Sequence, residues 1–347
     1  MRWSVLGYCL MALLGAPATR ADIGAASVLA SEIEHGEHAG FESFIMKTNG
    51  EVVARYVSPA LTKAPPDLRS ATKSITALLV GIALDRGDIA SVHANVAKLL
   101  PAEYGNLLSK DPEKAKLTIE DLLTMRSGLA CNDWDPKSPG HEDKMYGKRD
   151  WVAFWASQPI IGAPGERFSY CTGNIIALGV LLEEATHSPI DQYAASHLFG
   201  PLGIMRADWA HWNRGKRTDT GGHLRLAPDD LLKLGELVLA RGRIADKQIV
   251  SSTWIEAMTH PHAEIPGTPQ MYGYLWWLDR TKTANLPSTE LCWAQGNGGN
   301  LLIVLPGVKT VIVTTGTRFN RPDALEPMFW LRDRILPGLN PSRELSQ

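Results

Sequence analysis

The stretch SATKSITALLVGIALDRG, residues 70–87, decides the fold. Its apolar positions recur at helical spacing and stop at a glycine: Ile75, Leu78, Leu79, Ile82, then Gly87. Because this spacing brings side chains back to one face, it predicts a buried helix that begins at or just before Ser70. The preceding Pro65-Pro66-Asp67 fits a helix start at this point.

Ser70 and Lys73 share a face of this predicted helix, which places a hydroxyl beside an amine. A serine becomes a nucleophile only when a neighbour takes its proton, and a desolvated lysine at a helix start can be neutral enough to do so. The helix N-terminus also favours negative charge on a reacting oxygen. Since Ser-x-x-Lys arises roughly once by chance in a chain of this length, its place at the start of a buried helix carries the hypothesis.

Two further segments could complete a reactive site. Tyr170 lies in PGERFSYCTGN, residues 164–174, just before a predicted helix, where its phenol could relay the proton of the serine. Taken alone, such a tyrosine is more often a core aromatic. The segment AQGNGG, residues 294–299, ends a strand, and its glycines would let a backbone amide approach a developing oxyanion. The alternative is a loose glycine turn between strands.

The remaining patterns predict a single α+β domain. Before residue 70 they indicate a helix at 25–38 and two strands within 42–56, around the turn Thr48-Asn49-Gly50. After it come mainly helices over 89–227, three apolar runs at 291–295, 301–305 and 309–315, and a helix at 324–336. We therefore expect both ends of the chain to share one antiparallel sheet flanked by terminal helices, with a helical region inserted at about 89–227.

In this order and context, the three segments resemble the active-site elements of the serine beta-lactamase and penicillin-binding-protein superfamily. The resemblance is closest to its class C-like esterase and 6-aminohexanoate-dimer hydrolase branch, and it covers nearly all of residues 22–347. It extends to residues 117–129 (LTIEDLLTMRSGL), 226–242 (LAPDDLLKLGELVLARG) and 272–278 (YGYLWWL). It implies a beta-lactamase/transpeptidase-like fold and a serine hydrolase that works through an acyl-enzyme, without a cofactor.

The resemblance also implies a role for each matching residue. Ser70 would be the nucleophile, Lys73 its base partner and Tyr170 the second proton carrier. The backbone amides of Ser70 and Asn297 would form the oxyanion hole. No Gly-x-Ser-x-Gly segment occurs in the sequence, which argues against an α/β-hydrolase.

Two departures from the beta-lactamase pattern bear on the substrate. Thr172 replaces the asparagine that those enzymes carry two residues after the tyrosine, and Ala294-Gln295-Gly296 stands where they have Lys-Thr-Gly. That segment helps to bind the carboxylate of the antibiotic, so the loss of its cation favours uncharged esters or amides. Thr172, Gln295 and Gly296 are therefore expected to contact the substrate.

Trp134 falls near the position where the 6-aminohexanoate-dimer hydrolases place a substrate-contacting aromatic. Trp276-Trp277 resembles their tandem tryptophans beside the pocket, which makes Trp134 and Trp277 substrate-binding candidates. The alternative is that these tryptophans fill a large core. Nearby polar residues are expected to be solvated loop charges or a turn residue: Asp133, Asp135, Glu166 and Ser127.

Residues 1–21 carry the three parts of a secretory signal: Arg2, an apolar run at 5–14, and small residues at 16–21. We expect cleavage after Ala18 or Ala21 and a periplasmic or secreted protein. The apolar run is shorter than the roughly 20 residues that span a bilayer, so no stable membrane anchor is expected. A formal net charge of -2 argues against nucleic acid, and no His or Cys spacing is typical of a metal site.

Cys9 lies in the predicted signal, which leaves three cysteines and suggests one bridge and one buried thiol. We predict a disulfide between Cys131 and Cys171, because Cys131 lies in the loop expected to border the cleft and Cys171 follows Tyr170. Cys292, on a predicted inner strand, should stay reduced.

Two other functions stay open on the sequence. A true beta-lactamase or DD-peptidase would fit export and Ser-x-x-Lys, but not the missing Lys-Thr-Gly lysine. A non-catalytic sensor module would be acylated by its ligand and would never deacylate.

Overall fold

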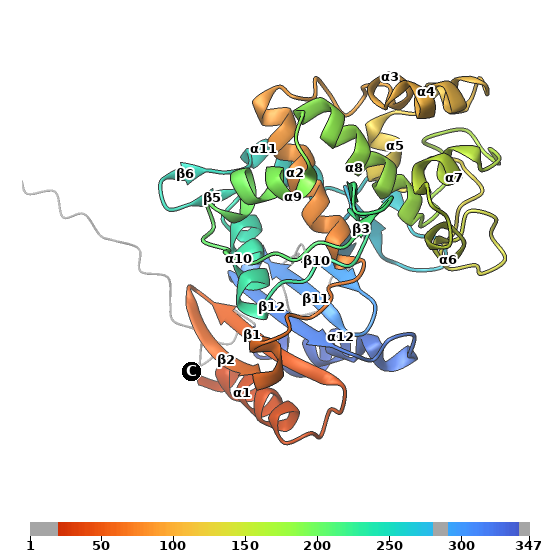
Figure 1. Ribbon diagram of the computed structural model, residues 1–347. Coiled ribbons are helices and arrows are strands. Elements are labelled where there is room, and N and C mark those ends of the chain that lie inside the picture. Colours follow the sequence, from red (N-terminus) through yellow and green to blue (C-terminus); the bar gives the residue numbers. More distant parts are fainter. Residues whose placement is uncertain (1–19, 280–290, 340–347) are drawn as a thin grey trace, which may run out of the picture.

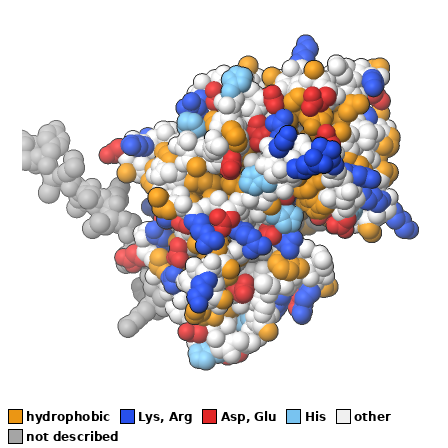
Figure 2. Space-filling view, in the orientation of Figure 1, with side chains coloured by type: hydrophobic (Ala, Val, Ile, Leu, Met, Phe, Trp, Pro, Cys, Tyr) orange, Lys and Arg blue, Asp and Glu red, His pale blue; other side chains and the backbone are white. Residues whose placement is uncertain are grey.

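The computed structural model describes residues 20–279 and 291–339, in which a large antiparallel sheet adjoins a mainly helical region (Figure 1). The predicted signal peptide lies almost wholly outside these residues and stays a prediction. On the face that Figure 2 shows, Lys and Arg side chains are interspersed with Asp and Glu. Within the described part, no helix is long and apolar enough to cross a membrane.

The sheet has eight strands in the order β2-β1-β12-β11-β10-β9-β8-β7. Their bounds are β1 Phe41–Thr48, β2 Glu51–Val57, β7 Ala263–Glu264, β8 Met271–Tyr272, β9 Trp277–Asp279, β10 Leu291–Gly296, β11 Asn300–Leu305 and β12 Thr310–Gly316. In Figure 1 the red-to-orange N-terminal hairpin lies beside the blue C-terminal strands. Both ends of the chain therefore share one antiparallel sheet, as predicted.

The first hairpin closes through Asn49 and Gly50, whose φ angles are 49° and 85°. Two successive positive φ angles give a turn whose twist matches that of the flanking strands, and Asn-Gly is the pair that tolerates them. β7, β8 and β9 extend the other edge of the sheet and were not predicted. With two or three residues each, they are too short to show an alternating pattern.

Terminal helices cover one side of the sheet (Figure 1). α1 (Arg20–Glu34) packs on β1 and β2, and it ends four residues earlier than predicted, because residues 35–40 form turns with positive φ at Gly36 and Gly40. The C-terminal helix is a 3-10 turn (Pro322–Leu325), α12 (Glu326–Trp330) and a π turn (Leu331–Ile335) instead of one α-helix.

The helical region lies on the other side of the sheet, joined to it by α2 (Ala71–Arg86) and α10 (Pro228–Leu239). Its other helices are α3 Val96–Leu99, α4 Ala102–Ser109, α5 Ile119–Leu123, α6 Glu142–Tyr146, α7 Trp151–Ser157, α8 Thr172–Thr186, α9 Ile190–Ala194 and α11 Ser252–Met258. Two short hairpins belong to it: β3 His211–Trp212 with β4 Arg217–Thr218, and β5 Arg243–Ile244 with β6 Lys247–Gln248. α2 is buried on every face from Ala71 to Ala83, so its N-terminus is held at the boundary between helices and sheet.

Candidate active site

Ser70 is the N-cap residue of α2, at the boundary between the sheet and the helical region. Arg69 before it has a φ of 51°, and its amide donates to Asp67 Oδ1 at 2.9 Å. This tight turn directs the chain into α2 and places Ser70 at the start of the helix. One turn later, Lys73 is 1% exposed, and its Nζ donates to Ser70 Oγ at 3.0 Å and to the Gly221 carbonyl at 2.6 Å.

Tyr170 reaches the same point from the segment before α8. Its side chain interacts with that of Ser70, and its ring centroid lies 5.1 Å from Lys73 Nζ. The segment is fixed on both sides of Tyr170, since the Ser169 amide donates to the Met125 carbonyl at 2.8 Å and the Asp133 amide donates to the Tyr170 carbonyl at 2.8 Å. The structure thus brings the predicted Ser70, Lys73 and Tyr170 together.

The charges around Lys73 act against the neutral form that its predicted role as a base requires. Burial alone would lower the pKa of Lys73, but the negative charges of ionised Tyr170, Glu142, Asp133 and Asp219 outweigh burial and raise it. Burial also raises the pKa of Tyr170, against the lowering effect of the Lys73 cation and the hydrogen bond with Ser70. The ionised form of each group thus stabilises the ionised form of the other, so proton loss from Lys73 and from Tyr170 is coupled.

An acidic cluster, which we define as Asp133, Glu142 and Asp219, lies behind this pair. Sequence reasoning took Asp133 for a solvated charge and overlooked Glu142 and Asp219. Asp133 is instead partly buried, and burial together with the Glu142 charge raises its pKa to about 6. Asp219 is almost fully buried and accepts from the amides of Gly221 and Gly222 at 3.0 and 2.9 Å, which fixes the carbonyl that holds Lys73.

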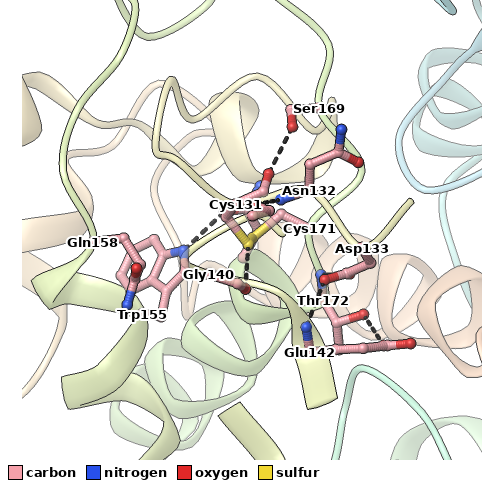
Figure 3. The surroundings of a disulfide bond; sticks show 12 residues. Cys131, Asn132, Asp133, Gly140, Glu142, Trp155, Gln158, Ser169, Cys171 and Thr172 are labelled. Atoms are coloured by element: carbon pink, nitrogen blue, oxygen red, sulfur yellow. Dashed lines mark hydrogen bonds between the residues drawn. A yellow bond between two sulfur atoms is a disulfide. The ribbon is translucent and has the colours of Figure 1, made fainter. Parts of the chain in front are cut away.

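Thr172 supports the acidic cluster (Figure 3). It is fully buried, its amide donates to Asp133 Oδ2 at 2.5 Å, and its hydroxyl donates to Glu142 Oε2 at 2.7 Å. Its polar groups are therefore committed to the two carboxylates, at the position where beta-lactamases carry their asparagine.

The end of β10 meets the start of α2. A Cβ atom on Gly296 would lie 1.9 Å from the Leu68 carbonyl oxygen and 3.2 Å from the Ala71 amide nitrogen, so only glycine fits here. Asn297 follows, and its side chain is tied to Asn320 by bonds of 2.7 and 2.9 Å. The backbone amides of Ser70 and Asn297, the two predicted oxyanion-hole donors, therefore belong to segments that meet at this junction of strand and helix.

Aromatic rings surround Tyr170. Trp134, 52% exposed, stacks on Tyr170 with centroids 5.4 Å apart, and it also lies against Trp277 at 6.1 Å. Three rings that sequence reasoning missed complete the wall: Phe168, Tyr272 and Trp293. Trp293 donates to Gln295 Oε1 at 3.0 Å, and its place two residues before Gln295 on one strand was the signal that could have found it.

The predicted disulfide between Cys131 and Cys171 is present, with Cα atoms 5.4 Å apart (Figure 3). Cys292 is buried on β10 and takes no part in it. The bridge joins the segment of Asp133 and Trp134 to the segment of Tyr170. Among the described residues, no group of three or more His, Cys, Asp or Glu is arranged to hold a metal ion.

An antiparallel sheet joined to a helical region, with Ser and Lys one turn apart at their boundary, defines the class of beta-lactamase and penicillin-binding proteins. The model of the Beta-lactamase family matches residues 27–335, and the chain belongs to this family. It therefore falls in a superfamily of serine hydrolases.

Solved structures share the fold. A protein described as a 6-aminohexanoate-dimer hydrolase from Bacillus anthracis has a TM-score of 0.72 at 18% identity, over 86% of this chain and 79% of that one. EstCE1, described as a hydrolase with promiscuous acyltransferase activity, has a TM-score of 0.71 at 14% identity, over 90% and 97%. A penicillin-binding protein homologue from Pyrococcus abyssi has a TM-score of 0.65 at 21% identity, over 92% and 78%.

Curated relatives match over shorter segments. An uncharacterized protein of Mycobacterium tuberculosis is 32% identical over 104 residues, 29% of this chain and 26% of that protein. Monacolin J acid methylbutanoyltransferase of Aspergillus terreus is 27% identical over 164 residues, 42% of this chain and 38% of that enzyme. The match thus spans well under half the length of either relative.

Proposed function

We propose that this protein hydrolyses esters or amides of small molecules through an acyl-enzyme on Ser70. The observation that carries the proposal is the hydrogen bond of Lys73 Nζ to Ser70 Oγ at 3.0 Å, with the Tyr170 ring 5.1 Å from the same Nζ. A hydroxyl that contacts two buried proton carriers at a helix N-terminus has the geometry of an activated nucleophile.

In the proposed reaction, Ser70 Oγ bonds to the substrate carbonyl carbon while its proton passes to the Tyr170–Lys73 pair. The carbonyl electron pair moves to the oxygen, which accepts from the backbone amides of Ser70 and Asn297. Collapse of this intermediate expels the alcohol or amine, which takes the proton from Tyr170. Water then attacks the acyl carbon, the acid leaves and Ser70 regains its proton.

Two features favour an uncharged and largely apolar substrate. Ala294 is buried in β10 and supplies no cation where beta-lactamases have one, and Gln295 is held by Trp293. The aromatic wall over Tyr170, with the exposed Trp134 at its edge, offers apolar contact area. A planar or alkyl acyl group would bury against it.

Acyl transfer to an alcohol is a second candidate, because two similar proteins are described as acyltransferases in whole or in part. It uses the same acyl-enzyme, with an alcohol in place of water in the second step. Trp134 would favour it by covering the acyl group against water.

A turnover panel tests the proposal: p-nitrophenyl esters of graded chain length with and without an added alcohol, a linear amino-acid amide dimer, and a chromogenic cephalosporin. We expect ester turnover that Ser70→Ala abolishes and the control Ser127→Ala preserves. A phosphonate ester probe should label Ser70. Faster turnover of the cephalosporin would favour the beta-lactamase alternative, and a single burst without turnover would favour the sensor.

We also propose export, with residues 1–21 as the signal and a periplasmic or secreted product. The Cys131–Cys171 disulfide supports this, because such bridges persist in oxidising compartments. Intact mass of the exported protein should correspond to cleavage after Ala18 or Ala21. A soluble exported chain that retains Met1 would contradict it.

A further inference from the structure

The acidic cluster behind Lys73 is connected to it through a continuous set of contacts. Glu142 accepts from the Thr172 hydroxyl at 2.7 Å. The Thr172 methyl group packs against Gly221, where a Cβ atom would lie 2.7 Å from it. The Gly221 carbonyl in turn accepts from Lys73 Nζ at 2.6 Å. A change at Glu142 is therefore three contacts away from the ammonium, through Thr172 and Gly221.

The same cluster is tied to the segment of Tyr170. Asp133 Oδ1 accepts from the Glu142 amide at 2.9 Å, and Asp133 Oδ2 accepts from the Thr172 amide at 2.5 Å. Asp133 lies two residues after Cys131, and Thr172 directly follows Cys171, so the Cys131–Cys171 disulfide holds Asp133 and Thr172 close together. This double anchoring fixes where the two carboxylates lie relative to Tyr170.

The cluster acts on Lys73 by its field and not by a direct ion pair. Lys73 Nζ donates to Ser70 Oγ and to the Gly221 carbonyl, and neither acceptor is a carboxylate. The charged and titratable groups around Lys73 come from four segments: Tyr170 before α8, Glu142 on α6, Asp133 in the loop after Cys131, and Asp219 before Gly221. Tyr146 on α6 also lies by Glu142, at 3.4 Å, and His223 lies by Asp219, at 2.9 Å.

We propose that Glu142 is a positioning residue that sets the pH at which Ser70 becomes a nucleophile, by anchoring Thr172 and holding a negative charge behind the Lys73 ammonium. This inference rests on the proposed function, because it assigns the proton-transfer pair of that reaction its electrostatic partner. Ser70 can transfer its proton to the Tyr170–Lys73 pair only after one of these two groups has lost a proton. The Glu142 carboxylate raises the pKa of Lys73, so the pair loses this proton only at a higher pH.

The variant Glu142→Gln isolates the charge. A glutamine side-chain oxygen can still accept from the Thr172 hydroxyl and from Tyr146, so the anchoring is kept while the charge is removed. Asp143→Asn is the matched control, since Asp143 is the next residue on α6 and its side chain is 83% exposed. It removes the same charge from the surface.

Two readouts separate this inference from the proposed function. In the first, the Lys73 ammonium is titrated by NMR on nitrogen-15-labelled lysine, which needs no substrate. In the second, the rate at which a phosphonate ester labels Ser70 is measured against pH. For Glu142→Gln we expect both midpoints to fall by about one pH unit, the order of the effect of one nearby opposite charge on a buried group.

At a pH below the midpoint, labelling of Glu142→Gln should therefore be about tenfold faster than that of the wild type. Asp143→Asn should match the wild type in both readouts. If the Glu142→Gln titration of Lys73 matches that of Asp143→Asn, the inference is wrong. A shifted Lys73 titration with no labelling of wild-type Ser70 would uphold the effect of the Glu142 charge on Lys73 but refute the proposed function, and with it the role of Glu142 in activating Ser70.

Discussion

Replacing Gly296 by alanine should disable the enzyme by separating β10 from the start of α2. The new Cβ atom would lie 1.9 Å from the Leu68 carbonyl oxygen, whereas real Cβ contacts are essentially never closer than 3.0 Å. The strand end must therefore move by about 1.1 Å, and the obstacle is backbone that cannot rotate away. This displaces the Asn297 amide relative to Ser70. A misplacement of about 1 Å at a reacting group costs on the order of 10²-fold in rate.

The measurement is kcat/KM for a p-nitrophenyl ester, together with thermal unfolding. We expect kcat/KM to fall about 100-fold, with a loss of about 1–3 kcal/mol in stability from overpacking. Gly162→Ala is the control, since a Cβ atom there meets nothing within 4 Å. A folded Gly296→Ala protein with activity within threefold of the wild type would refute the close approach of strand and helix, and with it the oxyanion hole.

Three further outcomes are expected. Replacing Cys131 and Cys171 by alanine should lower the free energy of unfolding by about 4 kcal/mol, for a bridge that spans 40 residues, and a urea midpoint unchanged from the wild type would contradict this. Because the pKa values of Lys73 and Tyr170 are both raised, kcat/KM should increase as the pH rises above 7, and a flat pH–rate profile between 7 and 9 would argue against this proton pair. The hydrogen bond from Arg334 lowers the pKa of Glu32 to about 2. The stabilisation that ionised Glu32 gives the fold is therefore present above about pH 4.5 and is lost as the pH falls towards 2. The difference in melting temperature between the wild type and Glu32→Gln should shrink over that range.

The elements predicted from the sequence are those with a long local pattern. α2 carries a helical repeat that stops at Gly87, the first hairpin carries Asn-Gly, and β10 to β12 are apolar runs between turn residues. Such patterns are set by burial on one face or on all faces, so they can be read without knowing the neighbours. The contact of Ser70 with Lys73 follows from the same helix, because it needs only the spacing of three residues.

The acidic cluster could not be predicted in this way. Glu142 belongs to α6, a helix of five residues after an irregular loop, and Asp219 lies in a loop whose fold depends on its own bonds to Gly221 and Gly222. Nothing in the local sequence says that these carboxylates meet behind Lys73. They meet because the disulfide and the bonds of Asp133 fix one loop against the start of α8. The effect of these charges on Lys73 could not be predicted for the same reason, since its charged neighbours are distant in sequence.

The pair Ser70 and Lys73 differs from its surroundings, Glu142, Asp133 and Trp134, in how freely the residues could be substituted. Ser70 and Lys73 lie on a helix buried on all faces, so their relative geometry is fixed by the core of the fold. Glu142, Asp133 and Trp134 lie on a short helix and a loop that join this core through a few hydrogen bonds and one disulfide. Substitutions there can alter the charge behind Lys73, or the aromatic surface over Tyr170, without moving Ser70. A family with one nucleophile geometry can in this way supply hydrolases that differ in working pH and in substrate.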